Sequence, residues 1–325
     1  MMRTRRRLTL LLLAQIGLIG LGISRFDSHG IRTALFEVIE TGDRRAFAWP
    51  PEQRPHWYRI DPGEAYRPLQ AQAQALLPEG EIRWEAVERL GAFVGDLWTE
   101  AGEPVEADSL IAIRSEIESG KSANCAHLSW LLSGYLSSLG VFSRVVGFDA
   151  ADGIGGNGHA VVEVWLEKRR KWMLMDPLNS ALFIRDGVPL SVLELREALL
   201  ADRTEGITIR QGPTHEIPKE RLLAEYEGLI RNITLDGRGD LISREKNRYG
   251  ILQFMAPLLD QAPRRPRRAV ANLIGARSVR VHLLDEFARP YHPRCWRLLS
   301  WALFGLISTL PLTVWGLLRG RKEPF

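Results

Sequence analysis

The sequence lacks the features that mark metal-binding, nucleotide-binding and disulfide-stapled proteins. Its 325 residues include only two cysteines, Cys125 and Cys295, too few for a disulfide framework. No Cys or His residues form a second ligand pair at the spacing of a zinc site. No nucleotide-binding glycine loop, EF-hand calcium loop or internal repeat is present. We therefore expect no metal, no cofactor and no disulfide between the two cysteines.

Charge is distributed unevenly along the chain, whose formal net charge is +4. Residues 1–23 contain four arginines and no acidic residue, and residues 294–325 contain five basic residues and one acidic residue. The stretch between these ends is therefore acidic overall, and the sequence pI of about 9.2 comes from the ends. This distribution does not indicate a nucleic-acid partner.

Both ends contain uncharged apolar runs. Leu8–Ile23 has 16 residues, and Leu298–Leu318 has 21, against about 20 for a full membrane span. We predict a signal-anchor over 1–23, with a cleaved signal peptide as the alternative, and a transmembrane helix with a basic tail over 297–325. Basic residues outside both runs predict cytoplasmic termini. The protein would then lie in the inner (cytoplasmic) membrane, with its body facing the periplasm.

Between the ends we expect three regions. They are an accessory, partly helical region over 24–109, a catalytic core over 110–217, and a helical C-terminal region with a basic linker over 218–296. The spacing of apolar residues predicts helices over Pro68–Thr99, Leu110–Glu118, Ser191–Ala201 and 218–259.

Cys125 has the local context of a reactive thiol. It begins an amphipathic helix, with Ser122 and Asn124 as candidate caps and Gly140 as the stop. The thiolate is the nucleophilic form of cysteine, whereas a free thiol, with a pKa of about 8.5, is mostly protonated at neutral pH. Unpaired N–H groups at a helix N-terminus favour negative charge. This position therefore favours the thiolate.

His159 and Asp176 are predicted to meet across a hairpin. His159 begins the alternating segment HAVVEVWL, and Asp176 ends KWMLMD after the turn EKRRK. In antiparallel pairing the start of one strand lies beside the end of the other. A carboxylate there fixes the imidazole tautomer and stabilises its charged form. Together with Cys125, these residues predict a Cys-His-Asp catalytic centre.

Simpler interpretations apply to each residue. A lone cysteine is most often a small buried apolar side chain, and an intact site of this kind can serve binding alone. His127 lies two positions after Cys125, so on a helix it points away from the thiol, and we do not assign it as the base. Arg144 is either an oxyanion or substrate contact or the partner of a carboxylate such as Glu163.

These motifs resemble the transglutaminase-like superfamily over about Ser119–Leu182. The matching elements are Cys125 at its helix start, the segment LGVFSRVVGF, the HAVVEVW strand, and W-x-x-x-D-P at Trp172–Pro177. The resemblance implies an α+β fold with a papain-like core, in which the Cys-bearing helix packs on an antiparallel sheet. It also implies that Cys125 is the nucleophile, His159 the general base and acid, and Asp176 the orienting residue.

This resemblance, together with the apolar runs at both ends of the chain, predicts a membrane-anchored, extracytoplasmic cysteine enzyme. We expect it to act on amide bonds through a thioester. On family grounds a peptidase or amidase is favoured over a cross-linking enzyme. The expected partner is a protein or peptide substrate, in a setting such as cell-envelope or surface-polysaccharide machinery. The alternative is a non-catalytic envelope scaffold that binds a peptide or glycan in the same cleft. The reactivity of the thiol distinguishes the two.

Overall fold

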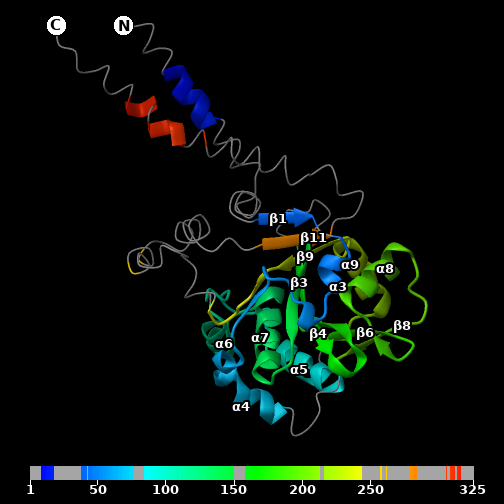
Figure 1. The fold of residues 1–325 in the computed structure, drawn as a ribbon. Coiled ribbons are helices and arrows are strands. Elements are labelled where there is room, and N and C mark those ends of the chain that lie inside the picture. Colours follow the sequence, from blue (N-terminus) through cyan, green and yellow to red (C-terminus); the bar gives the residue numbers. More distant parts are fainter. Residues whose placement is uncertain are drawn as a thin grey trace, which may run out of the picture.

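The computed structural model describes most of the body of the chain and short parts of both ends (Figure 1). Cys295 lies outside the described residues. The described residues are 9–17, 38–41, 43–76, 84–107, 109–149, 158–212, 216–243, 257, 261, 279–283, 305, 308–311 and 313–315.

A nine-stranded sheet, antiparallel except for its first pair of strands, forms the centre of the fold (Figure 1). The strand order is β1 (Val38–Thr41), β11 (Val279–Leu283), β9 (Asn232–Asp236), β3 (Ser143–Asp149), β4 (His159–Leu166), β5 (Lys171–Asp176), β6 (Ala181–Arg185) and β7 (Val188–Pro189), with β8 (Ile207–Gln211) also paired to β6. A separate two-stranded sheet joins β2 (Arg59–Ile60) to β10 (Arg238–Gly239). The main sheet thus includes strands that follow the predicted core in sequence.

Helices cover both faces of the main sheet. On one face α7 (Cys125–Ser138) packs against β3 and β4 and is surrounded by α4 (Arg67–Leu76), α5 (Trp84–Asp96) and α6 (Leu110–Glu118). On the other face lie α3 (Arg45–Ala48), α8 (Val192–Leu200) and α9 (Lys219–Leu229). The short 3₁₀ helices are η1 (Pro51–Gln53), η2 (Gly63–Tyr66) and η3 (Glu167–Arg169).

Strand β4 shows why both helical layers are needed, because all eight of its residues are buried. Val162 and Val164 belong to the apolar cluster around α7, whereas Val161 and Trp165 belong to the cluster around α8 and α9. Successive side chains of a strand point to opposite faces, so an apolar run buries both sides. The mixed helix and antiparallel-sheet fold expected from the sequence is confirmed.

The predicted helices agree with the structure over part of the chain. Helix α6 has the predicted bounds, Leu110–Glu118, and α7 begins at the predicted residue. The helix predicted over 218–259 is wrong at Asn232–Asp236, which forms β9. This segment pairs with β3 on one side and β11 on the other. Its backbone N–H and C=O groups are satisfied by the sheet, and this tertiary pairing overrides the apolar spacing.

Arg144 forms a buried ion pair with Glu163, as one of its two interpretations predicted. Its Nε and Nη2 donate to Oε2 of Glu163 at 2.9 and 2.6 Å, and Nη2 also donates to the carbonyl of Phe47. The guanidinium lies over the rings of Trp49 and Trp172, at 4.7 and 3.9 Å from their centroids. The pair thus ties the segment before the core to the sheet.

Replacing Arg144 by methionine is expected to lower the free energy of unfolding by about 3–5 kcal/mol, because Glu163 would stay buried without its cation. The side chains of this pair are 0% and 2% exposed. The matched control is Arg44→Met, which breaks an exposed pair with Glu197 and should cost at most about 1 kcal/mol. Urea unfolding followed by tryptophan fluorescence measures both. Equal losses in the two variants would contradict the structural role of the buried pair.

The two predicted membrane segments, 1–23 and 297–325, lie mostly outside the described residues. Among the residues that the structure does describe, no helix is long and apolar enough to cross a membrane. The described parts of the two ends nevertheless meet, because the side-chain amide of Gln15 donates to the hydroxyl of Thr309 at 3.0 Å. Figure 1 shows the corresponding helical pieces side by side.

Candidate active site

Cys125 is the first residue of α7, is half-buried, and is a free thiol. The helix starts here because Asn124 and His127 form a reciprocal cap. The Asn124 side-chain oxygen accepts from the backbone N–H of His127 at 3.0 Å, and the His127 ring accepts from the backbone N–H of Asn124 at 3.4 Å. Asn124, rather than Ser122, is therefore the cap. Cys125 lies in the first turn, where backbone N–H groups lack helical partners.

His159 and Asp176 are brought together by the β4–β5 hairpin. The register pairs Val162 with Met175 and Leu166 with Lys171, so the start of β4 lies beside the end of β5. The Nε2 atom of His159 is 2.8 Å from Oδ2 of Asp176. Both side chains are buried, Asp176 completely.

The carboxylate of Asp176 is surrounded by hydrogen-bond donors. Its Oδ1 accepts from the backbone N–H groups of Leu178 and Asn179 at 3.0 and 3.2 Å. Its Oδ2 accepts from the Asn179 side-chain amide at 2.8 Å and from the Tyr226 hydroxyl at 2.6 Å, besides contacting His159. Such donors offset the free-energy cost of burying a charged carboxylate.

The His159–Asp176 pair favours the charged form of both groups. Burial alone would lower the pKa of His159, but the charge and hydrogen bond of Asp176, together with the contact to Cys125, raise it to about 10. Burial alone would raise the pKa of Asp176, but His159, Tyr226 and Asn179 hold it below its usual value. Both shifts favour the imidazolium–carboxylate form of the pair.

Cys125 is linked to this pair through the imidazole ring, because the interaction of its side chain with His159 is among the causes that raise the pKa of His159. Since Nε2 of His159 faces Asp176, Nδ1 is the ring nitrogen left for the thiol. The structure thus brings all three predicted residues together, from the start of α7, the start of β4 and the end of β5. This is the arrangement required for a thiolate paired with an imidazolium.

Tyr226 is a residue of this site that the sequence interpretation did not identify. It lies on α9, fully buried, and its hydroxyl contacts Asp176. In the sequence it stands only as one apolar position of a predicted helix, 50 residues after Asp176. No local motif marks it, so only the packing of α9 on the sheet reveals it.

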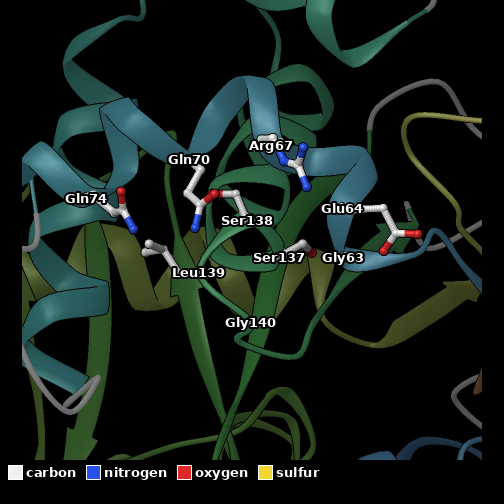
Figure 2. Close-up of a pocket in the computed structure, with 9 residues that line it drawn as sticks. All are labelled: Gly63, Glu64, Arg67, Gln70, Gln74, Ser137, Ser138, Leu139 and Gly140. Carbon is white, nitrogen blue, oxygen red and sulfur yellow. The ribbon is translucent and has the colours of Figure 1, made fainter.

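A separate cavity of about 400 Å³ lies at the other end of α7 (Figure 2). It is lined by Gly63, Glu64, Arg67, Gln70, Gln74, Ser137, Ser138, Leu139 and Gly140. Helix α7 has 14 residues, so a rise of about 1.5 Å per residue puts this cavity roughly 20 Å from Cys125. The cavity is therefore not part of the candidate site. Within the described ranges, no group of three or more His, Cys, Asp or Glu side chains could hold a metal ion.

Comparison with known proteins places the site within a recognised type of domain. A crystal structure described as that of "a Putative Cysteine Protease from Cytophaga hutchinsonii" aligns at 11% identity with a TM-score of 0.29, over 56% of this chain and 57% of the other. The chain thus spans little more than half the length of that protein. None of the curated proteins compared matches the chain. The family model of the transglutaminase-like superfamily matches residues 92–177, which include Cys125, His159 and Asp176. The chain therefore contains a transglutaminase-like core, built on a mixed helix and antiparallel-sheet fold.

Proposed function

We propose that the chain is a thiol enzyme that acts on amide bonds through an acyl thioester on Cys125. The observation that carries the proposal is the hydrogen-bonded His159–Asp176 pair, with the Cys125 side chain interacting with the same imidazole. The contact lies inside the segment similar to the transglutaminase-like superfamily. A thiolate, a proton donor and a buried anion that orients the donor are the parts that acyl transfer requires.

In the first half of the reaction, the Cys125 thiolate attacks the amide carbonyl carbon and a C–S bond forms. The carbonyl oxygen becomes an oxyanion, for which the Cys125 backbone N–H, in the first turn of α7, is a suitable donor. The His159 imidazolium then gives its proton to the amide nitrogen. The C–N bond breaks, the amine leaves, and an acyl thioester remains.

In the second half, neutral His159 takes a proton from water or from an acceptor amine, and the resulting nucleophile attacks the thioester carbonyl. The C–S bond breaks and restores the thiolate–imidazolium pair. Water gives a peptidase or amidase, and an amine gives a cross-linking enzyme. We propose hydrolysis as the main outcome, on the resemblance stated above, with a protein or peptide as the substrate.

Acylation by p-nitrophenyl acetate tests this proposal, because an activated ester forms the thioester without a specific leaving group. We expect a burst of nitrophenolate and an acetyl adduct on Cys125, identified by peptide mass spectrometry and removed by hydroxylamine. Addition of glycine methyl ester then measures how the thioester partitions between water and an amine. No adduct on Cys125, or the same adduct yield in His159→Ala, would favour the scaffold alternative.

We also propose that the terminal segments anchor the chain in the inner membrane and leave the body on the periplasmic side. The uncharged runs near both ends support this location. So does the polarity of the described end residues, because Gln15 is buried against Thr309 whereas Leu10 and Leu13 are 58% and 60% exposed. Polar contacts between helices and apolar side chains facing outward suit a lipid surrounding.

The substitution Arg169→Cys tests on which side of the membrane the body lies, because Arg169 of η3 is exposed. The other two cysteines are removed by Cys125→Ser and Cys295→Ser. We expect a membrane-impermeant maleimide to label this cysteine once the outer membrane of the cells is permeabilised. Labelling only after the inner membrane is broken would place the body in the cytoplasm and contradict the proposed location.

A further inference from the structure

Tyr226 reaches the site from α9, outside the segment that matches the family model. The matched segment, residues 92–177, ends one position after Asp176, whereas Tyr226 lies 50 positions after Asp176. Its hydroxyl lies 2.6 Å from Oδ2 of Asp176, shorter than the 2.8 Å contacts of that oxygen with His159 and Asn179. Hydrogen bonds to an ionised acceptor are shorter and stronger than neutral ones.

The aromatic ring of Tyr226 also packs beside the imidazole that Asp176 holds. The ring centroids of Tyr226 and His159 are 5.9 Å apart at an interplanar angle of 73°. The Tyr226 ring also packs against Phe148 of β3 and Phe183 of β6, whose ring centroids lie 5.5 and 4.7 Å from its own. One side chain therefore restricts both the carboxylate and the ring that the carboxylate orients.

The position of Tyr226 is fixed by the same sheet that carries His159. Helix α9 leads into β9, which pairs with β3 so that Ile233 lies opposite Phe148. The guanidinium of Arg196 on α8 donates twice to the carbonyl of Arg231, at 3.1 and 2.8 Å, just after α9. The C-terminal end of the helix that carries Tyr226 is thus held by the sheet and by α8.

The Tyr226 hydroxyl also remains a donor over the working pH range. Burial, followed by the negative charge of Asp176, raises its pKa well above the usual value, so it stays protonated. As a donor, the protonated phenol favours the ionised form of the Asp176 carboxylate.

We propose that Tyr226 is a positioning residue of the proposed reaction, which holds the Asp176 carboxylate in the plane and ionisation state that His159 requires. The inference rests on the proposed function, in which His159 moves the proton. Tyr226 is fully buried, so it does not reach the substrate in this scheme, and it acts through its contacts with Asp176 and the His159 ring.

Tyr226→Phe removes one oxygen and keeps the ring that packs on His159. We expect the rate of Cys125 acylation by p-nitrophenyl acetate to fall by about 10- to 100-fold, the range given by the loss of one hydrogen bond to a charged group. The KM should not change, because the phenol does not touch the ester. The pKa of Asp176 should rise, because one of the hydrogen bonds that lower it is lost.

The matched control is Tyr135→Phe, which also removes a buried phenol donor, here bonded to Gln72 at 2.7 Å away from the site. It should leave the acylation rate unchanged. Thermal unfolding of both variants shows whether either substitution lowers the fraction of folded protein. Equal rates in Tyr226→Phe and Tyr135→Phe would overturn the inference.

A second measurement separates failure of this inference from failure of the proposed function. The ¹⁵N signals of the His159 ring, followed by NMR during acid titration, report protonation of Asp176 without any turnover. We expect this acid step to move to higher pH in Tyr226→Phe and to stay in place in Tyr135→Phe. If the wild-type chain is not acylated, the proposed function fails, and the same titration still decides whether Tyr226 holds Asp176. An unmoved step would overturn the inference.

Discussion

Replacing Asp176 by asparagine is expected to lower the rate of Cys125 acylation by about 10³- to 10⁴-fold, the size of effect known for the orienting aspartate of serine proteases. The amide has nearly the shape of the carboxylate but no charge, so His159 loses the anion that stabilises its protonated form. In addition, donors approach both carboxylate oxygens, including Leu178 N–H at Oδ1 and the Tyr226 hydroxyl at Oδ2. In either orientation the NH₂ group of asparagine would face a donor.

The burst of nitrophenolate from p-nitrophenyl acetate measures this rate. Asn179→Ala is the matched control, because it removes the Asn179 side-chain donor to Asp176 and leaves the carboxylate in place. The acylation rate of Asn179→Ala should fall much less than that of Asp176→Asn. A comparable loss in both variants would mean that packing near the site, and not the charge of Asp176, supports the reaction.

The same substitution changes how stability depends on pH. The pKa of folded His159 is about 10, above its usual value of 6.5. The stabilisation from its charged form is therefore fully present below about pH 6.5 and is lost as the pH rises toward 10. In Asp176→Asn the loss of stability that comes from His159 should be absent. The changes in stability that come from other titrating groups should be the same in both proteins. Urea unfolding at pH 6, 8 and 9.5 measures the difference, and parallel pH profiles for the two proteins would contradict the ion pair.

The local setting of each of the three residues was predictable because it depends on short-range sequence features. Asn124 caps the helix that begins at Cys125, and a turn of a few residues joins the strands that carry His159 and Asp176. Caps and hairpins depend on neighbours in sequence, so their geometry follows from the sequence alone.

The parts that were missed depend on contacts between distant segments. Tyr226 meets Asp176 only because α9 packs on the sheet, and the apolar spacing that placed Tyr226 in a helix also extended that helix wrongly into β9. The pairing of β9 with β3 joins residues about 85 positions apart, such as Phe148 and Ile233. No periodicity within a short window contains that information.

The alkylation of Cys125 by iodoacetamide tests the thiolate–imidazolium pair without knowledge of the substrate. The protein for this measurement carries Cys295→Ser, so that Cys125 is its only cysteine. In this background we expect rapid alkylation of Cys125 at pH 7, because the thiolate is the nucleophile and the His159 imidazolium stabilises it. In His159→Ala the rate constant should fall by about 10-fold or more, because this partner is lost.

The rate constant of this alkylation at pH 7, compared between the background protein and His159→Ala, is the most direct test of the pairing of Cys125 with His159. We expect the protein with His159 to react about 10-fold or more faster than the variant without it. Equal rate constants, or a thiol that reacts slowly in both proteins, would contradict this pairing and leave a binding role for the site.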